Sequence, residues 1–227
     1  MRILAIDTAL EACSACVLDS GSDLPLSIES EPMQRGHAEA LMPMLERVMD
    51  AVEGGFASID RVAVTVGPGS FTGLRVGISA ARAIALATGV PAVGVTTLSA
   101  YAAPLIGAAG GALVGVAIDA RHGQIYCQVV ARGGRSIIAP QIMGLRDAVR
   151  QIGNGPVLLI GSGASVLCVE ARAAGLDAAV VDTAAAPEVL WVARLGLAAV
   201  PERALAKPFY LRSPDAKPQD HVRIPRR

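Results

Sequence analysis

The sequence predicts an α/β protein with two lobes, each a mixed sheet covered by helices. Short apolar runs alternate with amphipathic stretches, and this alternation is typical of sheets that contain parallel strand pairs. The 227 residues are many for one small α/β domain and sufficient for two. An apolar run that ends in aspartate occurs at Asp7 and again at Asp119, each time followed by a second run. This echo indicates a duplicated architecture.

The first lobe is expected to open with a meander of three strands. Residues 3–6 and 13–18 form two apolar runs, and residues 25–30 form a weaker third run. Cys13 and Cys16 have the spacing of a metal or redox pair, but residues three apart on a strand point to opposite faces. All four cysteines are therefore expected to be reduced, mostly buried thiols.

An amphipathic helix is expected after the meander. Its apolar stripe has helical spacing and consists of Leu41, Leu45, Val48 and Val52. Pro43 lies inside the stripe and predicts either a kink or a helix start near that residue. The pair Gly54 and Gly55 predicts the end of the helix.

Methionines concentrate around this helix, because four of the six fall between Met33 and Met49. Flexible thioethers suit a surface that packs against a partner, and they also fill cores; partner contact is slightly favoured. His37 and Glu39 precede the stripe. Such a pair can serve catalysis, but near a helix start Glu39 more readily complements the helix dipole while His37 caps or packs.

A strand, a glycine-rich turn and a long helix are expected next, at residues 61–66, 67–73 and 72–88. A strand at residues 92–95 and a helix that begins at Leu98 complete the lobe. The strand-helix alternation again predicts parallel pairing.

The composition shifts to small residues near position 107, which places the first lobe at residues 1–107 and the second at 108–213. The elements expected in the second lobe are strands at 113–118, 125–130 and 157–161 and a helix at 145–152. Residues 214–227 form a basic, proline-rich tail that is expected to be extended or mobile.

Composition excludes several classes of function. The 20 basic and 20 acidic residues cancel, and aromatic residues make up only 3%, so a free-standing nucleic-acid binder is not indicated. Apolar residues 3–6 are too few for a signal peptide. Residues 83–118 carry no charge, but glycines and prolines break them into pieces too short to span a membrane. A cytoplasmic protein is expected, with any RNA contact shared or local.

The turn at residues 67–73 lies between a strand and a helix, where backbone N–H groups and the helix dipole can hold a phosphate. It lacks the lysine and the spacing of a Walker A loop, and its glycines do not match the dinucleotide fingerprint. No Asp or Glu occurs between Asp60 and Asp119 to bind a ribose or a metal. A structural or docking turn is favoured, and a phosphate-binding turn is kept as the alternative.

The helix after this turn has two distinct faces. Its apolar face carries Leu74, Ile78, Ala81 and Ala85, and its polar face carries Arg75, Ser79 and Arg82. Small residues allow a second helix to approach closely, and two arginines without acidic neighbours indicate carboxylates supplied by a partner. The alternative is a solvated basic face.

Motifs along the whole chain resemble the TsaB (YeaZ) family. They are Ile6-Asp7-Thr8, Arg35-Gly36-His37-Ala38-Glu39, the stretch from Gly67 to Gly77, Asp119-Ala120-Arg121 and Tyr210-Leu211-Arg212. The resemblance implies an actin-like, Hsp70-like (ribonuclease H-like) two-lobed fold and a role in making threonylcarbamoyladenosine beside the tRNA anticodon. It also implies that the protein is not an enzyme on its own but a required component of a tRNA threonylcarbamoyl transferase complex. In that complex it would pair with the catalytic subunit TsaD, and the ATPase TsaE would join them. The complex would bring the protein to tRNA.

The same resemblance implies no metal site. TsaD-like proteins carry two metal-binding histidines after the equivalent helix, and Thr97 and Tyr101 stand at those positions here. Ala9 stands where actin-like ATPases usually have a glycine, so the resemblance implies no cofactor of its own and leaves ATP as a weak ligand. The candidate nucleotide-binding residues are Asp7, Thr8, Gly67, Gly69, Asp119, Gly161 and Gly163.

The leading hypothesis is a non-catalytic subunit whose two first-lobe helices pack against homologous helices of TsaD, with self-pairing to a homodimer as a side effect. The expected interface residues are His37, Leu41, Met42, Leu45, Met49, Thr72, Arg75, Ser79 and Arg82. The alternative is a free-standing ATPase, kinase or metalloprotease-like enzyme of the actin-like superfamily.

Overall fold

The computed structural model describes residues 1–212, so the tail expected at 214–227 lies outside the described residues. The elements up to residue 106 are β1 (Arg2–Asp7), β2 (Ala12–Asp19), β3 (Ser27–Pro32), α1 (His37–Asp50), η1 (Gly55–Ser58), β4 (Arg61–Gly67), α2 (Phe71–Thr88), β5 (Ala92–Thr96) and α3 (Thr97–Ile106). Those that follow are β6 (Leu113–Asp119), β7 (Gln124–Val130), η2 (Arg132–Gly134), β8 (Ser136–Gly144), α4 (Leu145–Ile152), β9 (Val157–Ile160), α5 (Ala164–Ala173), β10 (Ala178–Asp182) and α6 (Val189–Ala198).

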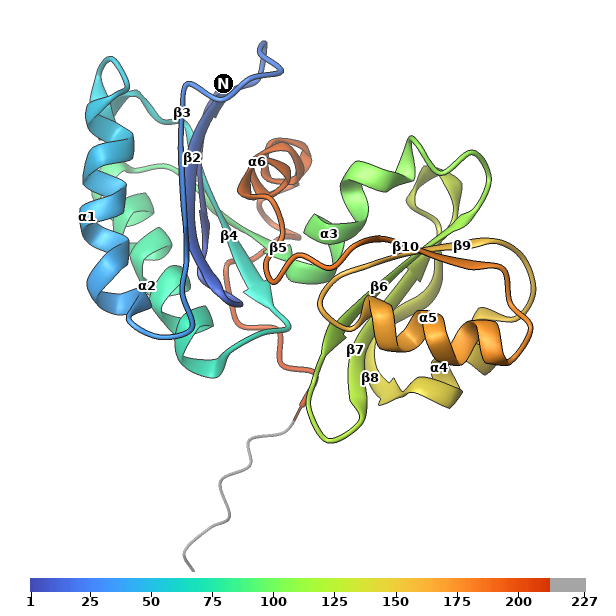
Figure 1. The fold of residues 1–227 in the computed structure, drawn as a ribbon. Helices are drawn as coiled ribbons and strands as arrows, with labels where there is room; N and C mark the ends of the chain where they lie inside the picture. The colour runs from blue at the N-terminus through green and yellow to red at the C-terminus, as the bar shows by residue number, and fades with distance from the viewer. Residues whose placement is uncertain (213–227) are drawn as a thin grey trace, which may run out of the picture.

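Two lobes are built on two five-stranded mixed sheets, as expected from the sequence (Figure 1). The strand orders are β3-β2-β1-β4-β5 and β10-β9-β6-β7-β8. In the first sheet β1 pairs antiparallel with β2 and parallel with β4, and in the second β6 pairs in the same two ways with β7 and β9. The order of strands and helices along the chain is also the same in both halves. The structure thus confirms the duplicated architecture.

Helices cover both faces of the first sheet. α1 and α2 lie side by side on its outer face, and α6 packs on the other face (Figure 1). The central strand β1 is buried on both sides, because Leu4 and Ile6 face α1 and α2 while Ile3 and Ala5 face α6. An apolar strand of this kind is typical of a sheet layer between helices.

The cysteines behave as the strand pattern predicts. Cys13 belongs to the core under α1 and α2, whereas Cys16 belongs to the core under α6. All four cysteines are free and buried, and burial raises the pKa of the Cys13 thiol to about 11. Side chains on opposite faces of a sheet cannot share a ligand.

The last helix of each half crosses to the other lobe. Leu98 and Tyr101 of α3 pack in a core with Val114 of the second sheet, while Val192 and Ala193 of α6 pack on the first sheet. Arg61 fixes this arrangement, since its Nη1 donates to the carbonyls of residues 196, 197 and 199 at the C-terminus of α6. The division at 107/108 therefore needs a correction, because α6 lies within 108–213 but packs on the first lobe.

Several boundaries differ from the expectations. α1 begins at His37 and contains Pro43, so the prediction that the helix could start near Pro43 is wrong. Gly36 directly before it has a φ of 90°, which glycine adopts without strain. The third strand lies at Ser27–Pro32, and β8, α5, β10 and α6 are additional to the expected elements. Among residues 1–212, the structure has no helix that is both long and apolar enough to span a membrane.

Candidate functional site

The glycine-rich turn before α2 packs directly against the end of β1. A Cβ atom added at Gly69 or Gly73 would overlap the backbone of Ala9 or Thr8. The contact is also hydrogen-bonded, because Ser70 N donates to the Ala9 carbonyl at 2.7 Å and the Thr8 hydroxyl donates to the Gly73 carbonyl at 2.7 Å. The Ser70 hydroxyl caps the helix by accepting from Gly73 N at 3.3 Å. The chain's own residues thus fill the space beside this turn.

Asp7 lies under the same turn and is fully buried. Its Oδ1 accepts hydrogen bonds from the Thr65 hydroxyl and, at 2.9 Å, from Ala9 N, whereas its Oδ2 has no hydrogen-bond partner among the described residues. Burial raises the pKa of this carboxyl group; the bonds from Thr65 and Ala9 and the nearby His37 act in the opposite direction. Among the candidate nucleotide-binding residues, Asp7 and Thr8 therefore stand in the core.

The second lobe brings its three candidate residues together at the end of β6. Gly163 N donates to the Ala117 carbonyl at 2.9 Å, and a Cβ added at Gly161 would lie 2.5 Å from the same oxygen. The Ser162 hydroxyl accepts from Asp119 N at 3.1 Å. Unlike Asp7, Asp119 is exposed. The loops before α2 and α5 therefore share one feature: their glycines allow the start of the helix to pack against the end of a strand, β1 or β6.

Four residues expected at the partner interface are in the core of the first lobe. His37 is 8% exposed, and Leu41, Leu45 and Met49 are exposed by 2% or less. The Nε2 atom of His37 lies 3.0 Å from the Leu10 carbonyl oxygen, so this side chain packs inward. The expectation of direct partner contact is wrong for these four side chains, because an apolar stripe serves a core as well as an interface.

The other expected interface residues lie on the outer surface of α1 and α2. Met42 is 56% exposed, and Thr72, Arg75, Ser79 and Arg82 are also exposed. Leu86 extends this face and is 86% exposed, although sequence reasoning missed it because it is surrounded by alanines. We call the surface formed by Met42, Ser79, Arg82 and Leu86 the outer helix face.

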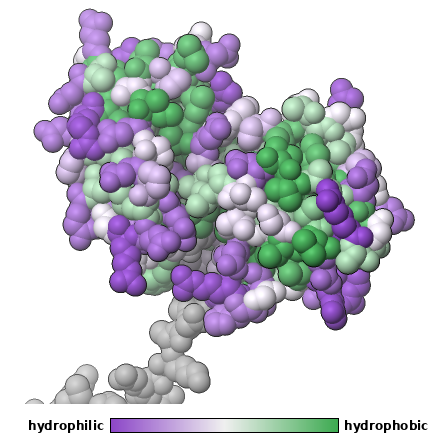
Figure 2. Space-filling view, viewed as in Figure 1, coloured by the Kyte–Doolittle hydropathy of each residue, from purple (hydrophilic) through white to green (hydrophobic). Residues whose placement is uncertain are grey.

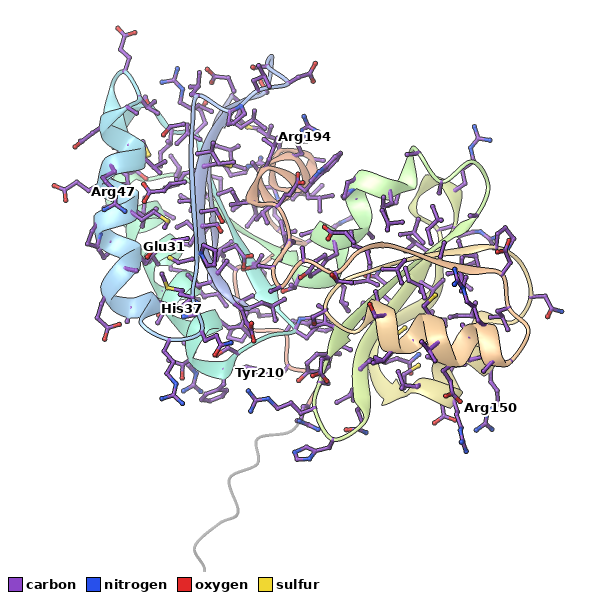
Figure 3. The ribbon with its side chains drawn as sticks, in the orientation of Figure 1. Glu31, His37, Arg47, Arg150, Arg194 and Tyr210 are labelled. Atoms are coloured by element: carbon purple, nitrogen blue, oxygen red, sulfur yellow. The ribbon has the colours of Figure 1, made fainter. Side chains whose placement is uncertain are left out.

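An aromatic pair stands at the N-terminal end of α2. The rings of Phe71 and Tyr210 are stacked with centroids 5.5 Å apart and an interplanar angle of 29°. The Arg75 guanidinium carbon lies 3.6 Å from the Phe71 centroid, and Arg75 Nε donates to the Tyr210 hydroxyl at 3.3 Å. Figure 3 shows Tyr210 beside this end of α2. Sequence reasoning noted Tyr210 only within a motif, since no local pattern pairs it with Phe71.

The segment that contains Tyr210 connects the two lobes. Phe209 N donates to the Val66 carbonyl at 2.7 Å in the first lobe. Arg212 donates to the Ala120 carbonyl at 2.9 Å and to Gln124 Oε1 at 3.0 Å, both at the β6–β7 hairpin of the second lobe. The side chains of this segment are thereby held between α2 and the hairpin.

The two positions compared with metal-binding histidines lie inside the protein. Thr97 and Tyr101 are buried on α3, and the Tyr101 hydroxyl donates to the Ala184 carbonyl at 2.8 Å. Burial raises the pKa of the Tyr101 phenol. Within residues 1–212, no three His, Cys, Asp or Glu side chains gather as a metal site would require.

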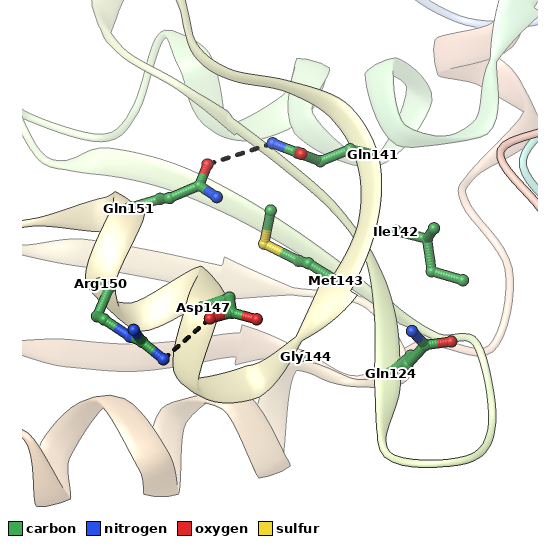
Figure 4. A pocket seen from close by; sticks show the side chains of 8 residues that line it. All are labelled: Gln124, Gln141, Ile142, Met143, Gly144, Asp147, Arg150 and Gln151. Atoms are coloured by element: carbon green, nitrogen blue, oxygen red, sulfur yellow. Dashed lines mark hydrogen bonds and ion pairs between the residues drawn. The ribbon is translucent and has the colours of Figure 1, made fainter.

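A separate polar groove lies in the second lobe between β8 and α4, with a volume of about 480 Å³ (Figure 4). Its side chains pair with one another: Arg150 lies 3.0 Å from Asp147, and Gln141 donates to Gln151 at 3.3 Å. Figure 2 shows hydrophobic side chains gathered over part of the second lobe. Exposed apolar residues of this lobe include Val166 and Val169 on α5.

Comparison with known proteins identifies relatives over most of the chain. Residues 31–185 match the family model TsaD, described as tRNA N6-adenosine threonylcarbamoyltransferase. The tRNA threonylcarbamoyladenosine biosynthesis protein TsaB of Haemophilus influenzae is 30% identical over 174 residues, which cover 72% of each chain. The protein of the same name from Escherichia coli is 39% identical over 126 residues, 56% of this chain and 53% of that protein. The matched part thus spans about half the length of the E. coli relative.

Solved structures agree with these relatives. A Pseudomonas aeruginosa protein described as similar to peptidase YeaZ has a TM-score of 0.73 at 27% identity, covering 93% of this chain and 99% of that one. A ROK hexokinase from Thermus thermophilus has a TM-score of 0.52 at 17% identity, covering 87% and 99%, and shares the fold. The sequence matches, the solved relatives and the duplicated two-lobed architecture together show that the chain belongs to the TsaB (YeaZ) family.

Proposed function

We propose that this protein acts in tRNA threonylcarbamoyladenosine biosynthesis as a non-catalytic subunit that supports a TsaD-like catalytic subunit. The names of its relatives from E. coli and H. influenzae support the pathway. The match to the TsaD family model supports a common origin with the catalytic subunit. On this proposal a TsaE-like ATPase joins the complex, and the complex brings the protein to tRNA in the cytoplasm.

The observation that carries the non-catalytic role is the state of Thr97 and Tyr101. Both side chains are in the core, and the Tyr101 hydroxyl donates its hydrogen bond to the Ala184 carbonyl. A threonine hydroxyl and a protonated phenol are poor ligands compared with two neutral imidazoles. The chain therefore offers no substitute for the histidine pair of a TsaD-like centre at these positions.

The outer helix face supports docking to the catalytic subunit. Ser79 and Ala83 are small and exposed, so a second helix can approach α2 closely at these positions. Arg82 is exposed, and none of the ion pairs within residues 1–212 involves it, so a partner carboxylate can bind it. Leu86, further along α2, and Met42 on the neighbouring α1 add exposed apolar side chains. Thr72 lies at the edge of the same interface, and Arg75, which bonds to Tyr210, marks its border. A second copy could use this interface for self-pairing.

The protein works without a cofactor of its own on this proposal. The backbone of Thr8 and Ala9 occupies the space beside the α2 turn, and Ser70 N already donates to Ala9. A nucleotide phosphate at a helix start needs free N–H groups and room for close approach. The lack of room beside Gly69 and Gly73 and the bond from Ser70 N to Ala9 both support this part of the proposal.

The docking proposal is tested with Ser79→Trp, which places a bulky side chain at the middle of α2. We expect it to abolish co-purification with the catalytic subunit and to slow tRNA threonylcarbamoylation at least tenfold, equivalent to about 1.4 kcal/mol. Ser165→Trp, at an exposed position of α5, is the matched control and should retain both.

The proposal would be overturned if the catalytic subunit and the ATPase modified tRNA equally fast without this protein. It would also be overturned if the isolated protein turned over ATP or cleaved peptides steadily. Intact complexes with both tryptophan variants would refute the outer helix face as the docking surface.

A further inference from the structure

Phe71 and Tyr210 are unusual in this protein because they are exposed. The chain has three Phe, three Tyr and one Trp, all within the described residues. Of these seven, only Phe71 and Tyr210 are largely solvent-accessible, at 46% and 43%, and they stack on each other. Large rings normally stabilise a fold by burial, so two adjacent exposed rings indicate a contact surface.

Two arginines that make no ion pair within residues 1–212 lie at this pair or in the segment that carries Tyr210. Arg75 lies over Phe71 and bonds to Tyr210. Among the described residues, Arg212 bonds to neutral oxygens of Ala120 and Gln124. Neither arginine takes part in an ion pair within residues 1–212. The helix that carries Arg75 also lies in the stretch free of acidic residues. Both positive charges are thus available to an anionic partner.

The β6–β7 hairpin extends the same surface into the second lobe. Arg121 and His122 form its tip with left-handed backbone, at φ values of 63° and 54°. The one carboxylate at this hairpin, Asp119, accepts a hydrogen bond from Arg121 N at 2.8 Å. After Arg212 the sequence contains more basic than acidic residues: four basic ones, Lys217, Arg223, Arg226 and Arg227, and two acidic ones, Asp215 and Asp220. Positive charge therefore dominates the sequence on both sides of the aromatic pair.

We propose that Phe71, Arg75, Tyr210 and Arg212, which we call the aromatic–arginine cluster, form a docking surface for unpaired RNA. The inference rests on the proposed function, and the RNA is the tRNA that the complex modifies. An unpaired base stacks on the exposed face of the aromatic pair, while Arg75 and Arg212 contact phosphates on either side. Exposed rings with unpaired guanidinium groups suit nucleotides better than an apolar peptide.

The position of the cluster suits this task. Tyr210 contacts the first lobe, and Arg212, two residues on, contacts the second. RNA bound across this segment would touch both lobes and would be held in one orientation. The outer helix face lies further along α2, towards its C-terminal end, so a protein subunit and the RNA could bind next to each other.

The test measures binding of unmodified tRNA to the full-length chain, alone and in complex with the catalytic subunit, over a range of salt concentrations. Phe71→Ser with Tyr210→Ser should weaken binding at least about fivefold, because stacking one base on an aromatic side chain contributes about that much or more. Arg75→Gln and Arg212→Gln should each reduce the slope of log K against log salt by about 1.

A second arginine–aromatic pair provides the matched control. Arg194 lies 4.6 Å from the Trp191 ring on α6, and Figure 3 shows Arg194 at the opposite end of the first lobe from Tyr210. Arg194→Gln removes the same charge and should leave both affinity and slope unchanged. Tyr210→Phe keeps the ring and should keep most of the affinity.

Gel filtration of the same variants separates this inference from the proposed function. A double-serine variant that binds tRNA as tightly as wild type, alone and in the complex, overturns the RNA surface. A variant that loses the catalytic subunit and retains its own tRNA affinity shows instead a protein contact and also overturns it. Failure of wild-type protein to form a complex refutes the proposed function, while the titration of the isolated chain still decides on RNA binding.

Discussion

Asp7 is a carboxylate buried at the end of the central strand, and it takes part in no ion pair within residues 1–212. Thr65 and Ala9 donate to one oxygen, and the other has no hydrogen-bond partner in the part of the chain that the structure describes. Desolvation disfavours the ionised form and raises the pKa of this group. A raised pKa in the folded state means that the folded protein holds the proton more tightly than the unfolded chain. The contribution to stability is therefore largest at low pH and is lost as pH rises through the raised pKa.

Asp7→Asn should remove this pH-dependent loss. The amide keeps an acceptor for Thr65 and Ala9 and cannot ionise, so the melting temperature of the variant relative to wild type should increase from pH 4 to pH 8. Thermal unfolding of both proteins at several pH values measures the difference. A difference that stays constant, or that falls with rising pH, would contradict the burial of an ionisable group at this position.

Residue roles were harder to predict from the sequence than residue patterns. The stripe of Leu41 and Leu45 was found because helical spacing is local information, but its partner was not, because the same stripe fits a core or an interface. The contact of Phe71 with Tyr210 joins the middle of the chain to its end, and no spacing rule reaches that far. Pairings of this kind appear only once the lobes are folded together.

Elements with a strong local signal were predicted well. The strand at Arg61–Gly67, the helix at Phe71–Thr88 and the helix at Leu145–Ile152 lie within one residue of their expected bounds or match them. The helices Ala164–Ala173 and Val189–Ala198 were missed, because Ala, Val and Leu fill most of their positions and leave no clear polar face. The first helix is defined by its packing on the neighbouring strands β9 and β10, and the second by its packing on the first sheet, which is distant in sequence.

The start of α2 depends on glycines that allow it to touch the end of β1. Gly73→Ala would place a methyl group against the backbone oxygen of Thr8, which cannot move without disturbing β1. We expect a destabilisation of about 1–3 kcal/mol, as is usual for overpacking. Urea unfolding measures the change.

Gly107 offers the matched control, because no atom of residues 1–212 lies within 4 Å of an added Cβ and its φ is −80°. Gly107→Ala should be neutral or slightly stabilising, by roughly 0–1 kcal/mol. Equal effects of the two alanines would show that the contact between the turn and β1 is looser than the structure indicates.

At the scale of the whole molecule, the exchange of helices makes the two lobes interdependent. α6 belongs to the second half of the chain and completes the core of the first sheet, and α3 does the converse. The sequence predicted the duplication and could not predict the exchange, because the echo at Asp7 and Asp119 says nothing about where the final helix of each half packs. The two halves share their strand order and the order of their elements along the chain.

Interdependent lobes should unfold in one cooperative transition. Trp191, the only tryptophan, lies on α6 and reports the first-lobe core, whereas circular dichroism reports both lobes. The two signals should coincide in urea. Gly196→Val should shift both together by about 1–3 kcal/mol, since an added Cβ would lie 2.5 Å from that of Ala63. Two separate transitions, or a shift in only one signal, would show independent lobes.

The packing of α6 on the first sheet, where Arg61 binds its C-terminal carbonyls, also affects the order in which the two lobes fold during synthesis. The first sheet leaves the ribosome early, but the helix that covers its inner face is residues 189–198, near the end of the chain. At synthesis rates of about 5–20 residues per second, the interval between residues 107 and 198 is roughly 5–20 s. During that time the apolar face later covered by Val192 and Ala193 is open to chaperones. The lobe that is synthesised first is therefore the one that finishes folding last.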